Sequence, residues 1–173
     1  MLHVLKASET AALMVTHDSE EAMFMSDNIV VLRDGQVQQT GRPVNLYCQP
    51  NSAFVAEFFG EVNQLEGIVA NGTIQTVLGV FEAPEDCVEG QQVQIVIRYE
   101  ALFIEPDSTG ANAEVMEARL LGRASLIHLS VPTGTNALHL HARVPGLNSL
   151  QSGSKVRITV DPSQAFVFPS PAM

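Results

Sequence analysis

One stretch of the sequence, Leu13 to Ala22, constrains the fold most, because an apolar run meets an acidic helix start around one histidine. Ala11 to Val15 is short, apolar and bounded by polar residues, which predicts a buried strand. Asp18 can cap the following helix, with Glu21 three residues later completing a capping box. His17 would then lie at the carboxyl end of a buried strand, where open α/β sheets bind ligands. A neutral imidazole there can hydrogen-bond a nucleotide phosphate.

The segment from Val15 to Ala22 resembles the switch-histidine segment of ABC-transporter ATPase subunits, and Asp27 to Gly41 resembles the sequence that follows it in that family. The resemblance implies that His17 contacts the γ-phosphate of ATP. Without the surrounding match, a lone histidine at a strand end would more often be an ordinary solvated side chain. The similarity continues at Pro43, Leu46-Tyr47, Pro50, Ala53-Phe54-Val55-Ala56 and Phe58-Phe59-Gly60.

Three segments on which that family depends for catalysis do not occur in this sequence. These are a Gly-x-x-x-x-Gly-Lys-Ser/Thr loop for the phosphates, an apolar run ending in Asp-Glu for magnesium and water, and a Leu-Ser-Gly-Gly-Gln signature. In the family all three precede the switch histidine. We therefore expect a non-catalytic C-terminal part of a longer ATPase, with no cofactor of its own. The parent would bind ATP and Mg²⁺, pair with transmembrane permease subunits, and lie on the cytoplasmic face of the plasma membrane.

Composition indicates a globular protein and excludes several classes of partner. Hydrophobic residues make up 46% of the chain and charged residues 16%, which is typical of a folded domain. The formal charge of −10 argues against nucleic acid and against an anionic membrane surface, since both need clustered Lys and Arg. No apolar run approaches the ~20 residues that span a bilayer. Cys48 and Cys87 have no metal-site spacing and are expected to be reduced thiols.

Residues 1–60 are predicted to be the α+β end of an ATPase domain. Asn51 is expected to cap the last helix, and Gly60 to end it in a left-handed conformation. Because strands at 11–16 and 28–32 would have exposed faces and edges, we expect a second copy to cover this region in a homodimer, or the region to be partly disordered. The expected elements are helices at 2–8, 20–25, 43–47 and 52–59, and a hairpin of strands 29–32 and 36–40 around Asp34-Gly35.

Residues 61–173 are predicted to form an all-β barrel, because short alternating runs recur between turn signals. They resemble the OB-like TOBE regulatory domain of such ATPases, most clearly at Ile97 to Leu102, although Tyr99 stands where the family has proline. Val160-Asp161-Pro162 and Phe166 to Pro169 also match. The pattern resembles importers of ferric iron, small anions or polyamines. The expected strands are 65–70, 73–78, 80–82, 92–98, 101–104, 113–121, 125–131, 137–143, 155–160 and 165–168.

Several side chains of this second domain have alternative interpretations. His139 and His141 alternate in one strand, so they share a face, and His128 on a neighbouring strand would complete a three-histidine metal site. An ordinary solvated face is the favoured interpretation, and no metal site is predicted. Arg98 could bind a regulatory anion, but a structural ion pair is favoured. The competing function for the whole chain is a stand-alone sensor of a small oxyanion or metal ion.

Overall fold

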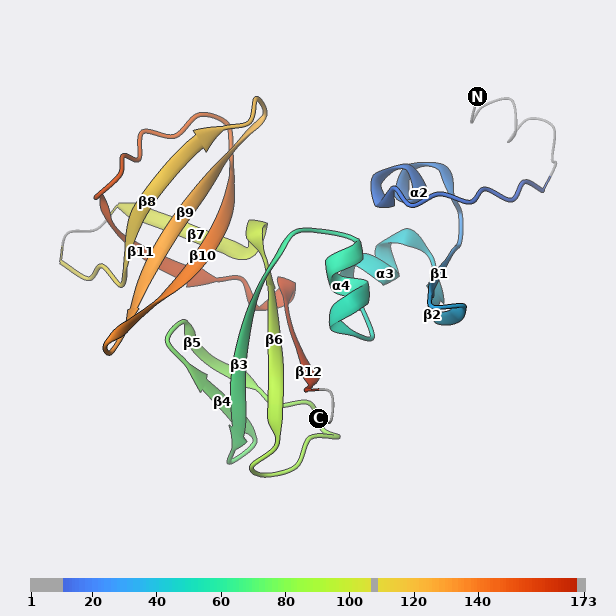
Figure 1. The fold of residues 1–173 in the computed structure, drawn as a ribbon, viewed down its shortest axis with the longest axis horizontal. Helices are drawn as coiled ribbons and strands as arrows, with labels where there is room; N and C mark the ends of the chain where they lie inside the picture. The colour runs from blue at the N-terminus through green and yellow to red at the C-terminus, as the bar shows by residue number, and fades with distance from the viewer. Residues whose placement is uncertain (1–10, 107–108, 171–173) are drawn as a thin grey trace. The chain divides into compact units, whose positions relative to one another are not determined.

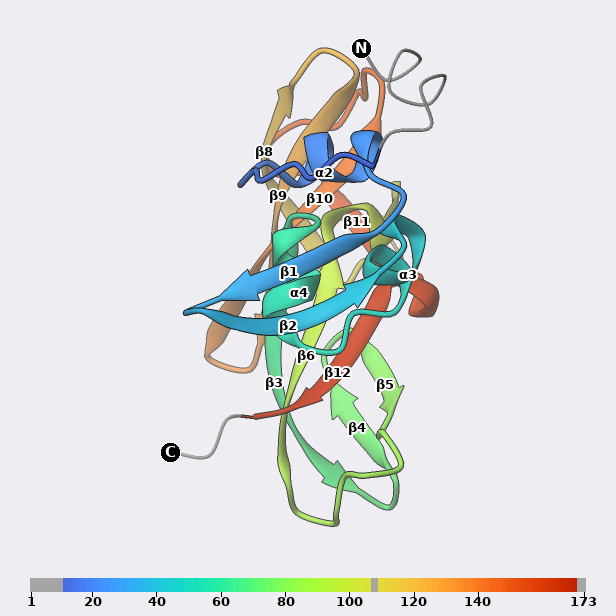
Figure 2. The same cartoon turned by 90° about the vertical axis from the view of Figure 1, so that its right-hand side faces the viewer.

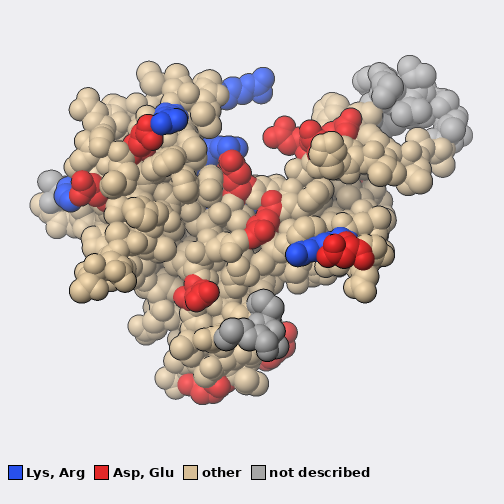
Figure 3. Space-filling view, in the orientation of Figure 1, with Lys and Arg blue, Asp and Glu red and all other residues tan. Residues whose placement is uncertain are grey.

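The computed structural model describes residues 11–106 and 109–170, and the chain divides into two compact units, Met1–Phe59 and Gly60–Met173 (Figure 1). Each unit is described separately. The helix expected at residues 2–8 lies outside the described residues. No helix of the described part is long and apolar enough to cross a membrane. On the face shown in Figure 3, the basic side chains are scattered and form no continuous patch.

The first unit contains three short helices and one hairpin. The hairpin turns at Asp34 and Gly35, whose φ angles of 52° and 75° are those that a tight turn of this kind requires, as predicted. Figure 2 shows the two strands side by side and antiparallel. A small core holds Ala22, Ile29, Val31, Leu46, Val55 and Phe59. The elements are α2 (Ser19–Met25), β1 (Ile29–Arg33), β2 (Gln36–Gly41), α3 (Pro43–Cys48) and α4 (Ala53–Phe58).

The strand predicted at Ala11 to Val15 is wrong for this structure, because these residues have no regular secondary structure. The side chains of Leu13 and Val15 are 95% and 92% exposed. A buried strand needs hydrogen-bonded neighbours and a packed face, and the described sheet of this unit has only β1 and β2. The apolar run therefore has the composition of a strand without the partners that would make it one.

The last helix of the first unit also differs from the prediction. Ser52, not Asn51, caps α4, and its hydroxyl accepts from the Val55 N–H at 3.4 Å. The Asn51 amide instead donates to the Gln38 carbonyl at 2.7 Å and ties this loop to β2. Gly60 does not adopt the left-handed conformation expected of it. Both residues precede or follow the helix closely, so local propensity alone does not separate a cap from its neighbour.

The second unit is built from two five-stranded sheets, one in the order β12-β6-β3-β4-β5 and the other in the order β10-β9-β8-β11-β7. This mostly β architecture agrees with the prediction. The strands are β3 (Val62–Ala70), β4 (Thr73–Thr76), β5 (Gly79–Glu82), β6 (Gln92–Arg98), β7 (Leu102–Pro106), β8 (Ala113–Leu120), β9 (Ala124–Thr133), β10 (Asn136–Pro145), β11 (Lys155–Val160) and β12 (Ala165–Pro169).

The two sheets have matching connections and exchange their last strands. In each half, an inner strand leads through a 3-10 turn into a strand that pairs in the other sheet: β6 through η1 (Tyr99–Ala101) into β7, and β11 through η2 (Pro162–Gln164) into β12. Thus β7 pairs with β11, and β12 pairs with β6. Each 3-10 turn is therefore the point where the chain crosses between sheets. The fully buried side chains shared by the core include Ile95, Ile97, Leu102, Ile127, Leu129 and Leu140.

Candidate functional site

The segment before α2 forms the cap that the sequence predicts. The Asp18 carboxylate accepts from the Glu21 N–H at 2.9 Å, which confirms Asp18 as the N-cap. The return bond runs through a third residue: the Thr16 hydroxyl donates to the Glu21 carboxylate at 2.6 Å and accepts from the Asp18 N–H at 3.1 Å. Three side chains thus hold the chain entry to the helix in one conformation.

His17, the predicted switch residue, lies inside this capped segment and is exposed. It does not follow a strand, because residues 11–16 do not form one. The structure therefore fixes the backbone on the helix side of His17 and leaves the other side without the sheet that would define a strand-end site.

Replacing Asp18 by alanine should loosen the first turn of α2. Loss of an N-cap costs about 1 kcal/mol, or roughly a fivefold change in the local opening equilibrium. The Ala22 N–H, which donates to the Asp18 carbonyl at 3.0 Å, reports this opening by hydrogen exchange. Glu20→Ala is the matched control, because Glu20 lies in the same first turn, whereas the N-cap of the helix is Asp18. Equal exchange rates in the two variants would contradict the capping argument.

In the second unit, three rings from three elements make contact, and we call Tyr99, His128 and His141 the ring cluster. His128 and His141 are direct cross-strand partners on β9 and β10, with ring centroids 4.4 Å apart and an edge-to-face angle of 77°. The ring of Tyr99 stacks on His141 at 5.1 Å and 23°. The imidazole of His141 is thus in contact with another ring from each of two elements.

An ion-pair network adjoins the ring cluster. The Arg143 guanidinium, two residues along β10 from His141, bonds to the Glu61 carboxylate and lies 3.7 Å from that of Glu100. Burial and the Glu61 carboxylate raise the pKa of Tyr99, and Arg143 opposes them. Burial, and secondarily His128, lower the pKa of His141. The network therefore has enough negative charge to compensate Arg143, while the imidazole of His141 favours its neutral form.

Only two of the three histidines considered together from the sequence are in contact. The structure brings His128 and His141 together, whereas His139 lies opposite Ser130. Within residues 11–106 and 109–170, no group of three or more His, Cys, Asp or Glu side chains is arranged to hold a metal ion.

Arg98, which the sequence suggested as an anion site, and Arg119 both take structural positions. Arg98 is fully buried, with its guanidinium 5.6 Å from the centre of the Phe166 ring, so the structural interpretation is favoured over an accessible anion site. Arg119 donates to the Glu117 carboxylate at 2.7 Å, which holds the pKa of that carboxyl below its usual range. Because Glu117 is the cross-strand neighbour of His128, this pair lies in the same row as the histidines.

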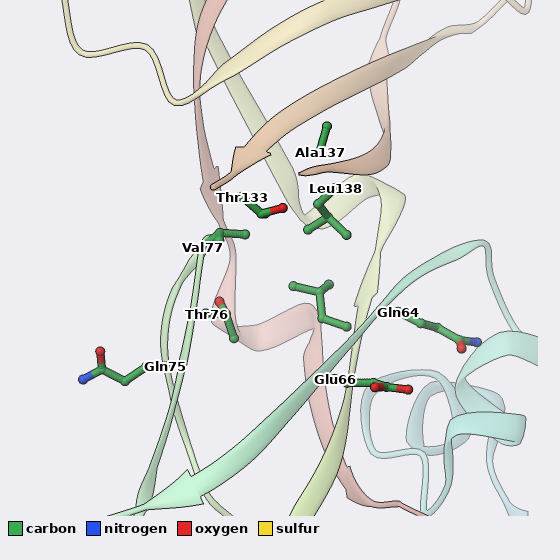
Figure 4. A pocket seen from close by; sticks show the side chains of 9 residues that line it. Gln64, Glu66, Gln75, Thr76, Val77, Thr133, Ala137 and Leu138 are labelled. Atoms are coloured by element: carbon green, nitrogen blue, oxygen red, sulfur yellow. The ribbon is translucent and has the colours of Figure 1, made fainter. Parts of the chain in front are cut away.

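A groove of about 630 Å³, not anticipated from sequence, lies between the two sheets of the second unit (Figure 4). In Figure 4 the side chains of Val77 and Leu138 point towards its centre, and those of Gln64 and Gln75 extend away from it. Glu66 is the one ionisable residue among those that line it, so the groove offers hydrogen-bonding and apolar contacts but no basic side chain. The lining residues are Gln64, Leu65, Glu66, Gln75, Thr76, Val77, Thr133, Ala137 and Leu138.

Comparison with known protein families and curated proteins gives consistent results for both units. The TOBE domain family matches residues 95–168. The sulfate/thiosulfate import ATP-binding protein CysA 1 of Chromobacterium violaceum is 34% identical over 90% of this chain and 45% of its own length. The spermidine/putrescine import ATP-binding protein PotA of Pseudomonas fluorescens is 38% identical over 90% of the chain and 43% of its own length. The Fe(3+) ions import ATP-binding protein FbpC of Fusobacterium nucleatum is 33% identical over 91% and 39%.

The chain thus spans less than half the length of each of these relatives, and it matches their C-terminal part. Among solved structures, the cytoplasmic molybdate-binding protein ModG, crystallised with molybdate bound, is similar with a TM-score of 0.50 and 16% identity. The similarity covers 63% of this chain and 96% of that one. At this identity it shows a shared fold, consistent with the OB-like architecture predicted for the second unit.

Proposed function

We propose that this chain is the C-terminal portion of the ATP-binding subunit of an ABC importer. The premises are the match of residues 95–168 to the TOBE domain family and the similarity of the chain to such subunits. Residues 1–60 would be the end of the ATPase domain, and residues 61–173 a regulatory and dimerisation domain. The observation that carries this proposal is that similarity of 33–38% identity runs through 90–91% of the chain and so includes both units.

His17 would contact the γ-phosphate of ATP in the complete subunit, with Mg²⁺ held by residues outside this chain. The Thr16–Asp18–Glu21 hydrogen bonds support this role, because they hold the histidine directly before a helix without using its imidazole. Alone, the chain would supply a switch residue and regulatory contacts but no phosphate-binding loop. It would not hydrolyse ATP.

A second copy and transmembrane permease subunits would be the partners, which would place the subunit in the cytoplasm at the inner face of the membrane. Exposed apolar side chains of the first unit support a covering partner: Leu13 and Phe24 are 95% and 76% exposed, and Leu32 on β1 is 62% exposed. Exposed apolar side chains on an unpaired strand edge recruit other chains.

Calorimetry with Mg-ATP tests whether the isolated chain binds nucleotide. The 173-residue chain is expected to bind no nucleotide, and His17→Ala is expected to behave in the same way. Saturable, magnesium-dependent binding by the wild-type chain would contradict a non-catalytic portion.

Light scattering is expected to give the mass of a dimer, and a monomer at all protein concentrations would contradict the proposed dimerisation.

A stand-alone sensor of a small ligand is the second candidate, and the groove between the sheets favours it. The molybdate-binding protein ModG has a similar fold, but the groove of this chain is lined by a carboxylate and no basic side chain. Cationic or neutral polar ligands therefore suit it better than oxyanions. The relatives named above include importers of ferric iron, which the sequence also suggested, together with sulfate and polyamine importers of comparable identity.

A thermal-shift series with molybdate, sulfate, ferric citrate and spermidine separates these ligands. An increase in the melting point with spermidine in the wild type that is absent in Glu66→Gln would support a cation sensor at the groove. A shift by molybdate that Glu66→Gln leaves unchanged would support an oxyanion sensor elsewhere. No shift with any of the four compounds would remove the sensor interpretation.

A further inference from the structure

The backbone around His141 forces the two histidines together. Asn63 on β3 uses both ends of its amide: Nδ2 donates to the His141 carbonyl, and Oδ1 accepts from the His141 N–H, both at 2.8 Å. The backbone groups of His141 therefore point away from β9, which makes His141 and His128 a non-hydrogen-bonded pair. Pairs of this type have the closest side chains in an antiparallel ladder. Asn63 is only 6% exposed, so this restraint is internal.

The other side of His141 is occupied by the element that joins the sheets. Tyr99, which stacks on the imidazole, is the first residue of η1. The η1 turn carries the chain from β6 in one sheet to β7 in the other. The Tyr99 N–H donates to the Glu61 carbonyl at 3.0 Å, and the Glu61 carboxylate is bound by Arg143. His141 is therefore in direct contact with the crossing between the sheets.

The surroundings of His141 on balance disfavour its charged form. Glu61, directly before β3, raises the pKa of His141, but burial, His128 and His139 outweigh it. Glu61 and, on η1, Glu100 also pair with Arg143, and Glu117 on β8 is bound to Arg119. The remaining ionisable neighbours are Tyr99 on η1 and His139, two residues before His141 on β10. A charged imidazole at His141 would be partly buried and in contact with His128, and both disfavour it.

We propose that the ring cluster is a pH-sensitive clasp on η1. With a neutral imidazole, His141 packs between His128 and Tyr99 and holds the crossing between the sheets. Protonation of His141 separates it from His128, disrupts the stack on Tyr99 and loosens η1. Acidification would then weaken the connection between the two sheets within the folded domain, without a ligand.

The direction of the pH dependence follows from His141. Its pKa in the folded protein lies below the ordinary value of an exposed histidine, because burial and His128 disfavour the charged form. The unfolded chain therefore binds this proton more readily than the folded protein does. The stabilisation is complete above about pH 6.5 and is lost as the pH falls through the folded pKa.

An NMR titration of the whole chain tests the clasp, because only five histidines need assignment. His141 is expected to titrate below pH 6.5, and the ring signals of Tyr99 are expected to move with it. His128→Gln should raise the pKa of His141 towards its ordinary value, whereas His139→Gln, on the same strand, should change it much less. A His141 that titrates at or above pH 6.5, or a pKa unchanged in His128→Gln, would overturn the proposal.

Fluorescence and thermal unfolding provide independent measurements of the same event. The chain has no tryptophan and two tyrosines, so a Tyr47→Phe background isolates Tyr99. Its emission is expected to change at the pH where His141 titrates, and the melting temperature should fall between pH 7.5 and 5.5. His128→Gln should reduce that fall, and His139→Gln should keep it. A fall of equal size in both variants, or Tyr99 emission independent of pH in this range, would contradict the clasp.

Discussion

Asn63→Ala is expected to destabilise the second unit by about 2–3 kcal/mol, because two backbone groups of His141 would lose their hydrogen-bond partners. The Asn63 amide makes both bonds at 2.8 Å and joins β3 of one sheet to β10 of the other. Removing a buried polar partner costs more than the bond itself contributes, since the groups left behind are no longer hydrogen-bonded. Urea unfolding at pH 7.5 measures the loss.

Two further variants separate the bonds from the side-chain volume. Asn63→Leu keeps a similar side-chain volume but makes neither hydrogen bond, so a loss similar to that of Asn63→Ala is expected. Asn136→Ala is the matched control, because Asn136 is exposed near the other end of β10. Its free energy of unfolding should stay within about 0.5 kcal/mol of the wild type. An Asn63→Ala variant as stable as this control would refute the role assigned to Asn63.

The elements that the sequence predicts well are those with local causes. The hairpin turn at Asp34-Gly35 needs two positive φ angles, and few other residue pairs adopt them easily. Most strands of the second unit alternate apolar and polar residues between turns, so their positions follow from the pattern within a few residues. Asp18 could be identified as a cap for the same reason, because its partner is only three residues away.

What the sequence leaves open depends on distant partners. Alternation places His139 and His141 on one face, but only the register of β9 and β10 brings His128 opposite His141 instead of His139. The stacking of Tyr99 on His141 additionally requires η1 to cross between the sheets. No local signal reports a strand that leaves its own half to pair in the other sheet. The groove was missed for the same reason, since its lining comes from strands far apart in the chain.

The strand predicted at residues 11–15 failed because a strand also depends on distant partners. Its apolar composition is a local signal for burial, but burial also needs a sheet to join, and the described residues of its unit supply only β1 and β2. The prediction of burial was therefore wrong for this structure, because Leu13 and Val15 are exposed and join no described strand.

Replacing Gly67 by alanine is expected to cost about 1–3 kcal/mol, because the new methyl group would overpack the core of the second unit. A Cβ at this position would lie 2.2 Å from Cγ2 of Ile74 and 3.3 Å from Cδ1 of Ile95. Both isoleucines are fully buried, so neither can move away without displacing other side chains. Gly41→Ala is the control, since its Cβ would meet nothing closer than 3.7 Å, and it should unfold like the wild type.

A double-mutant cycle identifies overpacking as the cause of the loss at Gly67. Ile74→Ala alone should cost about 2–5 kcal/mol through the cavity it leaves. In that background the methyl group of Gly67→Ala has space, so adding it should cost little or should recover some stability. The two changes should therefore couple favourably in chemical denaturation at pH 7.5. Strictly additive losses would show that the glycine is needed for a reason other than its approach to Ile74.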